Sequence, residues 1–251
     1  MQNRSMTRLG LFQLRLAATV GLLLLVYALV RLLWYPGAYF TISGVTRLLL
    51  ILVAVVLVIG PGLSALVYRP GKKGLVMDLG LLAVLEVVAV SLAVSQIHAQ
   101  RPFYAVFAVD RFESVSRSEI DTTQITGITL QTRPGHEPRL VYAERPSDGA
   151  RLDKLIDETL FEGKPDIDRR PEFWRPFPVG IPVLKAAASP LGSLLNGDTE
   201  RAVEVRHWLS GTGRNASDYL YLPMRGKNAD AMMILHADIG YPVDILAVDP
   251  W

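Results

Sequence analysis

The uncharged stretch at residues 48–68, LLLILVAVVLVIGPGLSALVY, decides the fold of this chain. A helix of this length, rising about 1.5 Å per residue, crosses the roughly 30 Å of hydrocarbon in a bilayer. After the basic turn YRPGKKG at 68–74, residues 75–97 are apolar again except for Asp78, Glu86 and a few small polar residues. We therefore expect two membrane-spanning helices, over 47–68 and 75–97, that fold back on each other around the turn.

A third apolar segment, at 16–35, lies nearer the N-terminus. It is longer than the apolar region of a typical signal peptide, and no small-x-small cleavage site follows it before Trp34-Tyr35-Pro36-Gly37. We interpret it as an uncleaved membrane anchor. The expected organisation is a membrane protein with a cytoplasmic segment at 1–15, three N-terminal transmembrane α-helices within 16–98, and a C-terminal α+β periplasmic domain at 99–251.

The formal net charge of +2 conceals two halves of opposite sign. Residues 1–98 contain eight Lys or Arg and two acidic residues, whereas residues 99–251 contain 18 Lys or Arg and 22 acidic residues. Binding of nucleic acid needs a basic patch on the soluble part, so the acidic C-terminal half argues against it. The sequence has no cysteine, which excludes disulfides, thiolate metal sites and a cysteine nucleophile.

The positions of the basic residues predict an orientation in the bilayer, because cytoplasmic loops carry an excess of Lys and Arg. With three spans, Arg31 and Arg47 fall near one side, which we assign to the periplasm of a bacterial inner membrane. Four aromatic residues after the first span suit the headgroup region on that side: Trp34, Tyr35, Tyr39 and Phe40. Six basic residues fall on the other side and make it cytoplasmic: Arg4, Arg8, Arg15, Arg69, Lys72 and Lys73.

The second span contains Gly60-Pro61-Gly62 in its second half. Proline removes a backbone donor and clashes with the preceding turn, so we expect a kink or local unwinding there. Small residues let another helix approach closely. The kink either only shapes the bundle or offers a docking face for a partner helix, made by Gly60, Pro61, Gly62, Ser64, Ala65 and Glu86.

Two acidic residues lie in the third span. Asp78 is near the cytoplasmic interface, within reach of Lys72 or Lys73. Glu86 is about 16 Å of helical rise into the span and so near the bilayer midplane, where an ionisable group must be neutral, paired or facing a cavity. One hypothesis pairs Glu86 with Arg31 of the first span; the alternative is a protonated Glu86 hydrogen-bonded to a neighbouring helix while Arg31 reaches the interface.

The C-terminal domain alternates strand and helix patterns. Ser147-Asp148 is expected to cap a helix that runs to about Phe161, and 164–182 is interpreted as an extended surface loop anchored by Phe173, Trp174 and Phe177. Asp110-Arg111 after the first strand is interpreted as a buried ion pair that fixes the domain to its stalk, with a ligand clamp as the alternative. Strands are expected at 104–109, 125–130, 139–144, 219–223, 232–237 and 243–248, the last two joined by a hairpin at 238–241, and helices at 183–195 and 199–210.

The residues give little support to an enzyme. Asp78 and Glu86 are about 12 Å apart along one helix and cannot share a proton as an aspartic dyad. The histidines at 98, 136, 207 and 236 show no metal-ligand spacing. Gly211-Thr212-Gly213 lacks the context of a dinucleotide loop, and Gly192-Ser193 is not a nucleophile elbow. We expect no cofactor, no metal and no catalytic residue.

Several landmarks together resemble the type IV pilin accessory proteins of the TfpX/TfpZ kind. Their order and spacing carry the resemblance, which is densest from 34 to 113. One departure is Glu86, where glutamine is usual in that family. The matching residues are Trp34-Tyr35-Pro36-Gly37, Gly60-Pro61, Leu66-Val67-Tyr68, Pro70-Gly71-Lys72-Lys73, Asp78-Leu79, Arg101-Pro102, Val106-Phe107, Val109-Asp110-Arg111-Phe112 and the final Asp249-Pro250-Trp251.

This resemblance implies an inner-membrane, non-catalytic factor that binds a cognate major type IV pilin and modulates its assembly into pili, with consequences for twitching motility. The implied partners are that pilin, other inner-membrane pilus assembly proteins and the lipid bilayer. Two other classes stay open: a membrane-anchored periplasmic sensor or ligand-binding protein, and a membrane enzyme of pilin processing or modification. The small cytoplasmic portion argues against a sensor, because it leaves little chain to carry a signal inward.

Overall fold

The computed structural model describes residues 7–69, 72–121 and 138–251 of the chain. These residues form two compact units. The helical unit comprises Met1–Trp34 and Val45–Ala99, and the sheet domain comprises Tyr35–Gly44 and Gln100–Trp251. The predicted combination of three N-terminal apolar helices with an α+β domain is confirmed. The expected strand at 125–130 lies outside the described residues.

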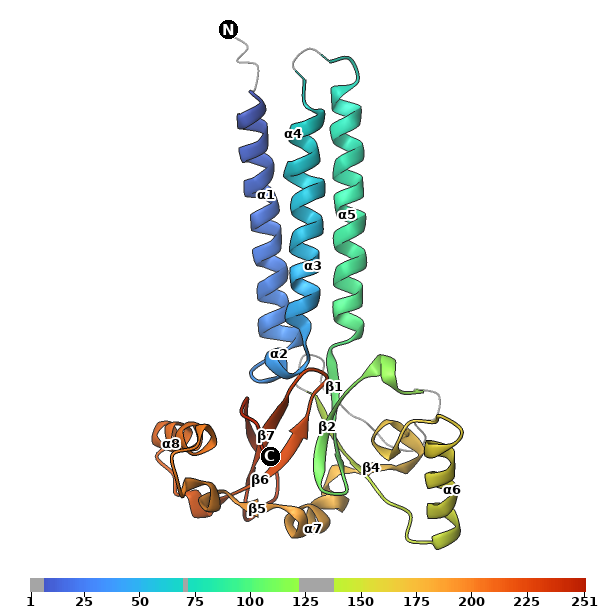
Figure 1. Ribbon diagram of the computed structural model, residues 1–251, viewed down its shortest axis with the longest axis vertical. Helices are drawn as coiled ribbons and strands as arrows, with labels where there is room; N and C mark the ends of the chain where they lie inside the picture. The colour runs from blue at the N-terminus through green and yellow to red at the C-terminus, as the bar shows by residue number, and fades with distance from the viewer. Residues whose placement is uncertain (1–6, 70–71, 122–137) are drawn as a thin grey trace. The chain divides into compact units, whose positions relative to one another are not determined.

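Three spans long and apolar enough to cross a membrane make up the helical unit, at Arg8–Trp34, Val45–Val67 and Leu75–Ala99. The middle span packs against both of the others, and the three lie side by side in Figure 1. The first is α1 (Arg8–Leu29) with a π-helical turn at Val30–Trp34; the second is α3 (Val45–Leu57), a π-helical turn at Val58–Gly62 and α4 (Leu63–Val67); the third is α5 (Leu75–Ala99).

The first span starts eight residues earlier than the predicted residue 16. The hydroxyl of Thr7 caps the helix by accepting a hydrogen bond from the Gly10 N–H at 3.1 Å. Such a cap satisfies one of the amide donors that every helix leaves open at its start. Arg8 and Arg15 therefore lie within the helix instead of preceding it.

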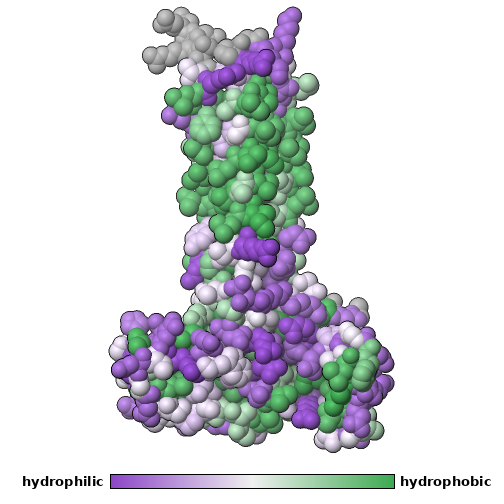
Figure 2. Space-filling model, viewed as in Figure 1, coloured by the Kyte–Doolittle hydropathy of each residue, from purple (hydrophilic) through white to green (hydrophobic). Residues whose placement is uncertain are grey.

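Burial in the helical unit is the reverse of that in a soluble bundle. The buried residues of α5 are Glu86 and Ile97, while leucines and valines such as Leu81, Val84 and Leu92 are mostly exposed. Figure 2 shows the resulting apolar exterior of the three spans. Exposure of so large an apolar surface to water would be unfavourable, whereas the acyl chains of a bilayer solvate it.

The sheet domain is built on one mixed sheet. The strands pair in the order β4-β3-β1-β2-β6-β7-β8, with β5 paired to β6; the β1–β3 and β2–β6 pairs are parallel and the others antiparallel. The strands are β1 (Pro102–Ala108), β2 (Arg111–Ser116), β3 (Arg139–Ala143), β4 (Trp174–Pro176), β5 (Ser189–Pro190), β6 (Tyr219–Arg225), β7 (Asp230–His236) and β8 (Pro242–Leu246).

Helices cover both faces of this sheet. Along β1, Ala105 and Phe107 point into one buried cluster and Tyr104 and Val106 into another, as the two-residue period of a strand requires. The longer helices of the domain are α6 (Gly149–Leu160), α7 (Phe177–Ala187) and α8 (Glu200–Thr212), each of which contributes residues to one of three buried clusters. Shorter 3-10 turns occupy Arg117–Glu119, Ile167–Arg169, Pro171–Phe173, Leu191–Leu195 and Ala216–Asp218.

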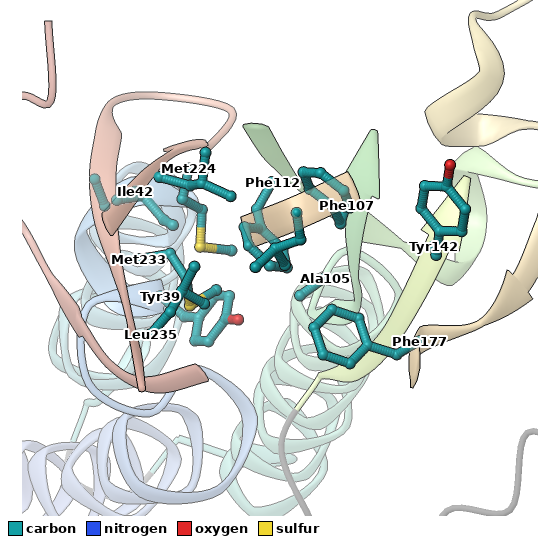
Figure 3. Packing of buried hydrophobic residues seen from close by; sticks show 13 residues of the cluster. Tyr39, Ile42, Ala105, Phe107, Phe112, Tyr142, Phe177, Met224, Met233 and Leu235 are labelled. Carbon is teal, nitrogen blue, oxygen red and sulfur yellow. The ribbon is translucent and has the colours of Figure 1, made fainter. Parts of the chain in front are cut away.

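The segment between the first two spans belongs to the core of the sheet domain. It contains the short helix α2 (Tyr39–Ile42), and Tyr39 and Ile42 pack with Phe112, Met224 and Met233 (Figure 3). The main chain adds a contact, because the Asn228 N–H donates to the Ile42 carbonyl at 2.8 Å. The expectation of a headgroup belt is therefore wrong for Tyr35 and Tyr39, which are 1% and 7% exposed inside the protein.

The expected loop at 164–182 is wrong in its second half. Strand β4 and the start of α7 lie there, and the predicted anchors Trp174 and Phe177 are buried. The prolines at 178 and 182 make α7 difficult to predict from the sequence. Pro178 stands in the first turn, where its missing N–H costs nothing, and Pro182 is tolerated within the helix because Phe177 and Leu184 bury a large apolar surface.

Candidate functional site

A polar cluster inside the helical unit is the strongest candidate for a functional site. Its members come from all three spans: Arg15 and Thr19 on α1, Gly60 in the middle span and Glu86 on α5. We call these four residues the Glu86 cluster. The Thr19 hydroxyl donates to Glu86 Oε1 at 3.0 Å, and Arg15 Nη1 lies 3.4 Å from Glu86 Oε2.

Gly60 makes room for this cluster. A Cβ on Gly60 would lie 2.6 Å from Glu86 Oε1 and 2.8 Å from the Thr19 hydroxyl, closer than a carbon can approach either oxygen. Gly60 lies in the π-helical turn Val58–Gly62, which also contains Pro61. The predicted local unwinding at Pro61 is thus present, and it places a residue without a side chain against the carboxylate.

Arg15 also donates to the protein backbone. Its Nη2 donates to the Leu79 carbonyl of α5 at 3.1 Å. One guanidinium therefore joins α1 to α5 through both a side chain and a carbonyl. Ion pairs within a membrane are rare and mark functional or assembly-critical positions, because an unpaired charge there is costly.

The hypothesis of an Arg31–Glu86 pair is wrong. Arg31 lies twelve residues beyond Thr19 on the same span, which is about 18 Å of helical rise. The error follows from the start of the first helix: because α1 begins at Arg8, the residue level with Glu86 is Thr19. Arg15 and Thr19 were missed, although their i, i+4 spacing on one helix face was a readable signal.

The predicted docking face is largely occupied by the protein's own helices. Gly60, Pro61, Ser64 and Glu86 are buried within the helical unit. Gly62 is exposed and Ala65 is half-buried. The small residues of the middle span therefore serve first to pack the three spans of this chain together.

Charged side chains beside the 68–74 turn have partners, and the pairing of Asp78 with Lys72 is the one that the sequence predicts. Lys72 Nζ lies 2.5 Å from Asp78 Oδ2 across the start of α5. Arg8 Nε donates to the Tyr68 carbonyl at 2.8 Å, which ties the first turn of α1 to the end of the middle span.

The Trp34-Tyr35-Pro36-Gly37 motif ends the first span and turns the chain. The Trp34 ring meets the His98 ring edge-on at 4.7 Å, which joins the ends of the first and third spans. Tyr35 is buried, and this burial raises its pKa. Gly37 has a φ of 56°, a left-handed conformation that glycine adopts without strain.

The Asp110-Arg111-Phe112 motif forms the end of the β1–β2 hairpin. The Asp110 side chain is 58% exposed and pairs with Arg111 at 3.1 Å, so the expected buried pair is wrong for Asp110. Arg111 Nε donates to the buried Glu113 at 2.9 Å instead. Phe112 is fully buried in the core of Figure 3.

Glu113 is the centre of a charged network in the sheet domain. Besides Arg111, its carboxylate lies 3.9 Å from both Arg169 and Arg225. The neighbouring Asp168 is also buried and pairs with Arg169. Desolvation raises the pKa of Asp168 to about 6, although the positive charge of Arg169 opposes this.

The final Asp249-Pro250-Trp251 motif folds back on the sheet domain. Trp251 Nε1 donates to Asp230 Oδ2 at 2.9 Å, and Arg201 Nη1 donates to the Pro250 carbonyl at 2.9 Å. These contacts fasten the end of the chain to β7 and α8. The motif therefore has a structural part in the domain.

Within residues 7–69, 72–121 and 138–251, no three His, Cys, Asp or Glu side chains gather as a metal site would require. His136 lies outside the described residues. His207 is exposed on α8, and the Trp208 ring beside it packs edge-on against Tyr219.

Two curated proteins resemble this chain over most of its length. One is a fimbrial assembly protein of serogroup I from Dichelobacter nodosus, 25% identical over 227 residues that cover 88% of this chain and 86% of that protein. The other, a fimbrial assembly protein of serogroup E1 from the same organism, is 25% identical over 216 residues and 82% of each chain. No protein-family model and no solved structure matches the chain. The similarity extends across both units and points to a family of pilus assembly proteins.

Proposed function

We propose that this protein is a non-catalytic accessory factor of type IV pilus assembly that binds a cognate major pilin in the bacterial inner membrane. One observation carries the proposal: the similarity to two fimbrial assembly proteins covers more than four fifths of the chain. Because it includes the spans as well as the sheet domain, the whole architecture and not one shared module supports a common role.

The architecture suits a partner that has one apolar helix and one soluble head, as the family resemblance implies for a pilin subunit. Three spans of 23 to 27 residues provide lipid-facing helix surface. The sheet domain provides a separate surface outside the bilayer. We propose that the N-terminus is cytoplasmic and the sheet domain periplasmic, as the excess of basic residues beside the 68–74 turn favours.

We place the pilin-helix contact on the exposed side of the middle span, at its π-helical turn. Gly62 is exposed there and Ala65 is half-buried, so a partner helix can approach their backbone closely. Val58 and Leu66 are exposed on the same span, at 60% and 72%, and would add apolar contact area. The buried Glu86 cluster acts indirectly in this proposal, by holding the π-helical turn in place against α1 and α5.

Deletion of the gene tests the function. Loss or strong reduction of surface pili and of twitching, restored by the wild-type gene, is the expected result. Normal piliation in the deletion strain would overturn the proposal. Total pilin should be measured in the same cells, because a pool of unassembled pilin separates an assembly role from an effect on pilin synthesis.

Substitution of Gly62 tests the contact. Gly62→Leu should weaken co-purification of pilin with the full-length protein, because a leucine would hold the two helices apart. Gly80→Leu is the matched control, since Gly80 is exposed on α5 and a Cβ added there would meet no atom within 4 Å. Equal pilin recovery with both variants, at equal expression, would remove Gly62 from the interface.

A further inference from the structure

A hollow lies between α6 and the tip of the β1–β2 hairpin in the sheet domain. Its volume is about 250 Å³, and its walls are mostly apolar. Leu155 and Ile156 line it from α6, Val109 lines it from the hairpin, and Ile167 lines it from the 3-10 turn that follows α6. We call this hollow the α6 pocket. Every residue that lines it belongs to the sheet domain, so its geometry is defined within that domain alone.

The α6 pocket lies at the end of the strands away from the attachment points of residues 122–137. These residues join the described part of the chain at Asp121 and Pro138. Pro138 precedes β3 at the end where the parallel strand β1 begins, and the antiparallel strand β2, which leads to Asp121, finishes at that same end. Val109 and Arg145 follow β1 and β3 at the opposite end. The lengths of these strands therefore separate the pocket from Pro138 and from the end of β2.

Apolar side chains extend the pocket onto the surface around it. Leu160 and Phe161 at the end of α6 are 69% and 80% exposed, and Val109 is 50% exposed. Figure 2 shows apolar residues gathered on the side of the sheet domain where α6 lies. Exposed apolar patches mark interaction sites. A hollow of about 250 Å³ is smaller than the roughly 300–1,000 Å³ of most small-molecule pockets, and a ligand confined to it would leave these side chains uncovered, whereas a protein segment would cover them.

The valine at the tip of the hairpin has a strained backbone. Val109 has a φ of 58°, and the Asp110 N–H donates to the Ala108 carbonyl at 2.7 Å, which is the hydrogen bond of a classic γ-turn. Glycine adopts a positive φ without strain, whereas a β-branched residue does so only rarely. Strain of this kind concentrates at binding and active sites. Here it holds an apolar side chain in the wall of the α6 pocket.

Arg145 supplies a positive charge at the edge of the α6 pocket. It is exposed, and it lines both this pocket and a second, more polar hollow at the start of α6. Over the described part of the chain its guanidinium has no hydrogen-bond or ion-pair partner. The acidic residues that line either hollow have partners of their own: Glu144 pairs with Arg175 at 2.9 Å, Glu172 with Arg170 at 2.7 Å, Asp148 accepts from the Ala150 N–H at 3.3 Å and Asp166 from the Ile167 N–H at 2.7 Å. A carboxylate on a ligand would therefore give Arg145 the partner that it lacks.

We infer that the α6 pocket binds a protein segment in which a large apolar side chain stands next to a carboxylate. The apolar side chain enters the pocket between Val109 and α6, and the carboxylate pairs with Arg145 at the edge. A guanidinium suits a carboxylate because its planar N–H groups match the two oxygens. Protein interfaces commonly combine an apolar anchor in a pocket with a polar rim. This site goes beyond the proposed role in pilus assembly and does not depend on it.

The test measures peptide binding to the full-length protein in nanodiscs, with empty nanodiscs as the blank. The probes are blocked peptides of glycine and serine with adjacent phenylalanine and glutamate at the centre, in either order, and a dye at one end for fluorescence anisotropy. Replacement of the phenylalanine of the tighter peptide by alanine should weaken binding by at least about ten-fold, because the buried ring is lost. Replacement of its glutamate by glutamine should weaken binding by about five-fold, the equivalent of about 1 kcal/mol for an exposed ion pair.

Protein variants then locate the site. Arg145→Gln should weaken binding of the glutamate peptide by about five-fold and leave the glutamine peptide unchanged, so that the two changes are coupled. Arg151→Gln is the matched control, because it removes the same charge from an exposed position on α6 that does not line the α6 pocket, and it should show no coupling. Val109→Gly should keep the stability of the wild type, since it relieves the strained φ, and yet weaken binding of the phenylalanine peptide.

Three results would overturn the inference. The first is a protein that binds none of the peptides, or that binds the phenylalanine and alanine peptides equally. The second is an equal effect of Arg145→Gln and Arg151→Gln, which would indicate a general attraction of charge. The third is displacement of the peptide by an equal concentration of octanoate, which has an apolar chain and a carboxylate but no peptide backbone, and which would indicate a site for a small amphiphile.

Discussion

Gly60 lies directly against the Glu86 carboxylate: a Cβ at Gly60 would lie 2.6 Å from Glu86 Oε1, so any side chain there would have to displace the carboxylate. The π-helical turn at Val58–Gly62 and the buried acid on α5 are therefore parts of one arrangement. A residue larger than glycine would push the carboxylate from Thr19 and Arg15, and it would separate the middle span from both neighbours.

We predict that Gly60→Ala destabilises the helical unit by about 1–3 kcal/mol, the usual cost of overpacking a well-packed interior. Thermal unfolding of the full-length protein in detergent measures this. Gly80→Ala is the control: Gly80 lies in a helix with open space around it, so alanine should leave stability unchanged or raise it by up to about 1 kcal/mol. Equal effects of the two substitutions would contradict the packing described for Gly60.

The Arg15–Glu86 contact should appear as an energetic coupling. Removal of one partner leaves the other charge inside the bundle, whereas replacement of both by leucine leaves an apolar interface. We expect Arg15→Leu and Glu86→Leu each to lower stability, and the double variant to be more stable than the sum of the two predicts, with a coupling of about 1–3 kcal/mol.

The control for this cycle pairs Arg31→Leu with Glu86→Leu. Arg31 lies about 18 Å of helical rise beyond Thr19, so its effect should add to that of Glu86 without coupling. A coupling of Glu86 with Arg31 as large as that with Arg15 would contradict the structure.

The spans and most strands could be predicted because their signals are local. An apolar run near 20 residues identifies a span, and alternation along 219–223 or 139–144 identifies a strand. The partner of Glu86 could not be predicted from a local signal, because it depends on where α1 begins. The helix begins after the Thr7 cap and includes Arg8 and Arg15, whereas the apolar segment in the sequence begins only at residue 16. An error of two helical turns at that end changed the partner.

The position of Tyr35–Gly44 shows a second limit. In the sequence, aromatic residues directly after a span fit a headgroup belt as well as they fit the core of a domain. Their burial in the core depends on contacts with Phe112, Met224 and Met233, which are far away along the chain. No local pattern encodes such contacts. The same holds for Glu113, whose arginine partners come from three separate segments.

Ile42 tests whether the segment between the first two spans stabilises the sheet domain. It is fully buried among the residues of the core cluster, so Ile42→Ala should lower the stability of this domain by about 2–5 kcal/mol. Thr41→Ala, at the exposed neighbouring position, should have little effect. Limited proteolysis within the sheet domain provides the measurement, and equal protection in both variants would show that the segment is not part of its core.

Asp168 should make the sheet domain less stable as the pH rises from about 4 through about 6. Its pKa is raised from 3.8 to about 6 by burial, so the folded state holds the proton more tightly than the unfolded state does. Its contribution to stability is therefore fully present below about pH 4 and is lost as the pH rises through about 6. Asp168→Asn removes this titration. We expect the variant to match the wild type in stability near pH 4 and to be more stable at pH 8 by at most about 3 kcal/mol, the equivalent of two pKa units.

Fluorescence of Trp174, whose indole N–H donates to the Ile167 carbonyl at 3.2 Å beside Asp168, can follow the unfolding. A variant that is less stable than the wild type at pH 8 would mean that the ion pair with Arg169 outweighs the cost of burying the charge.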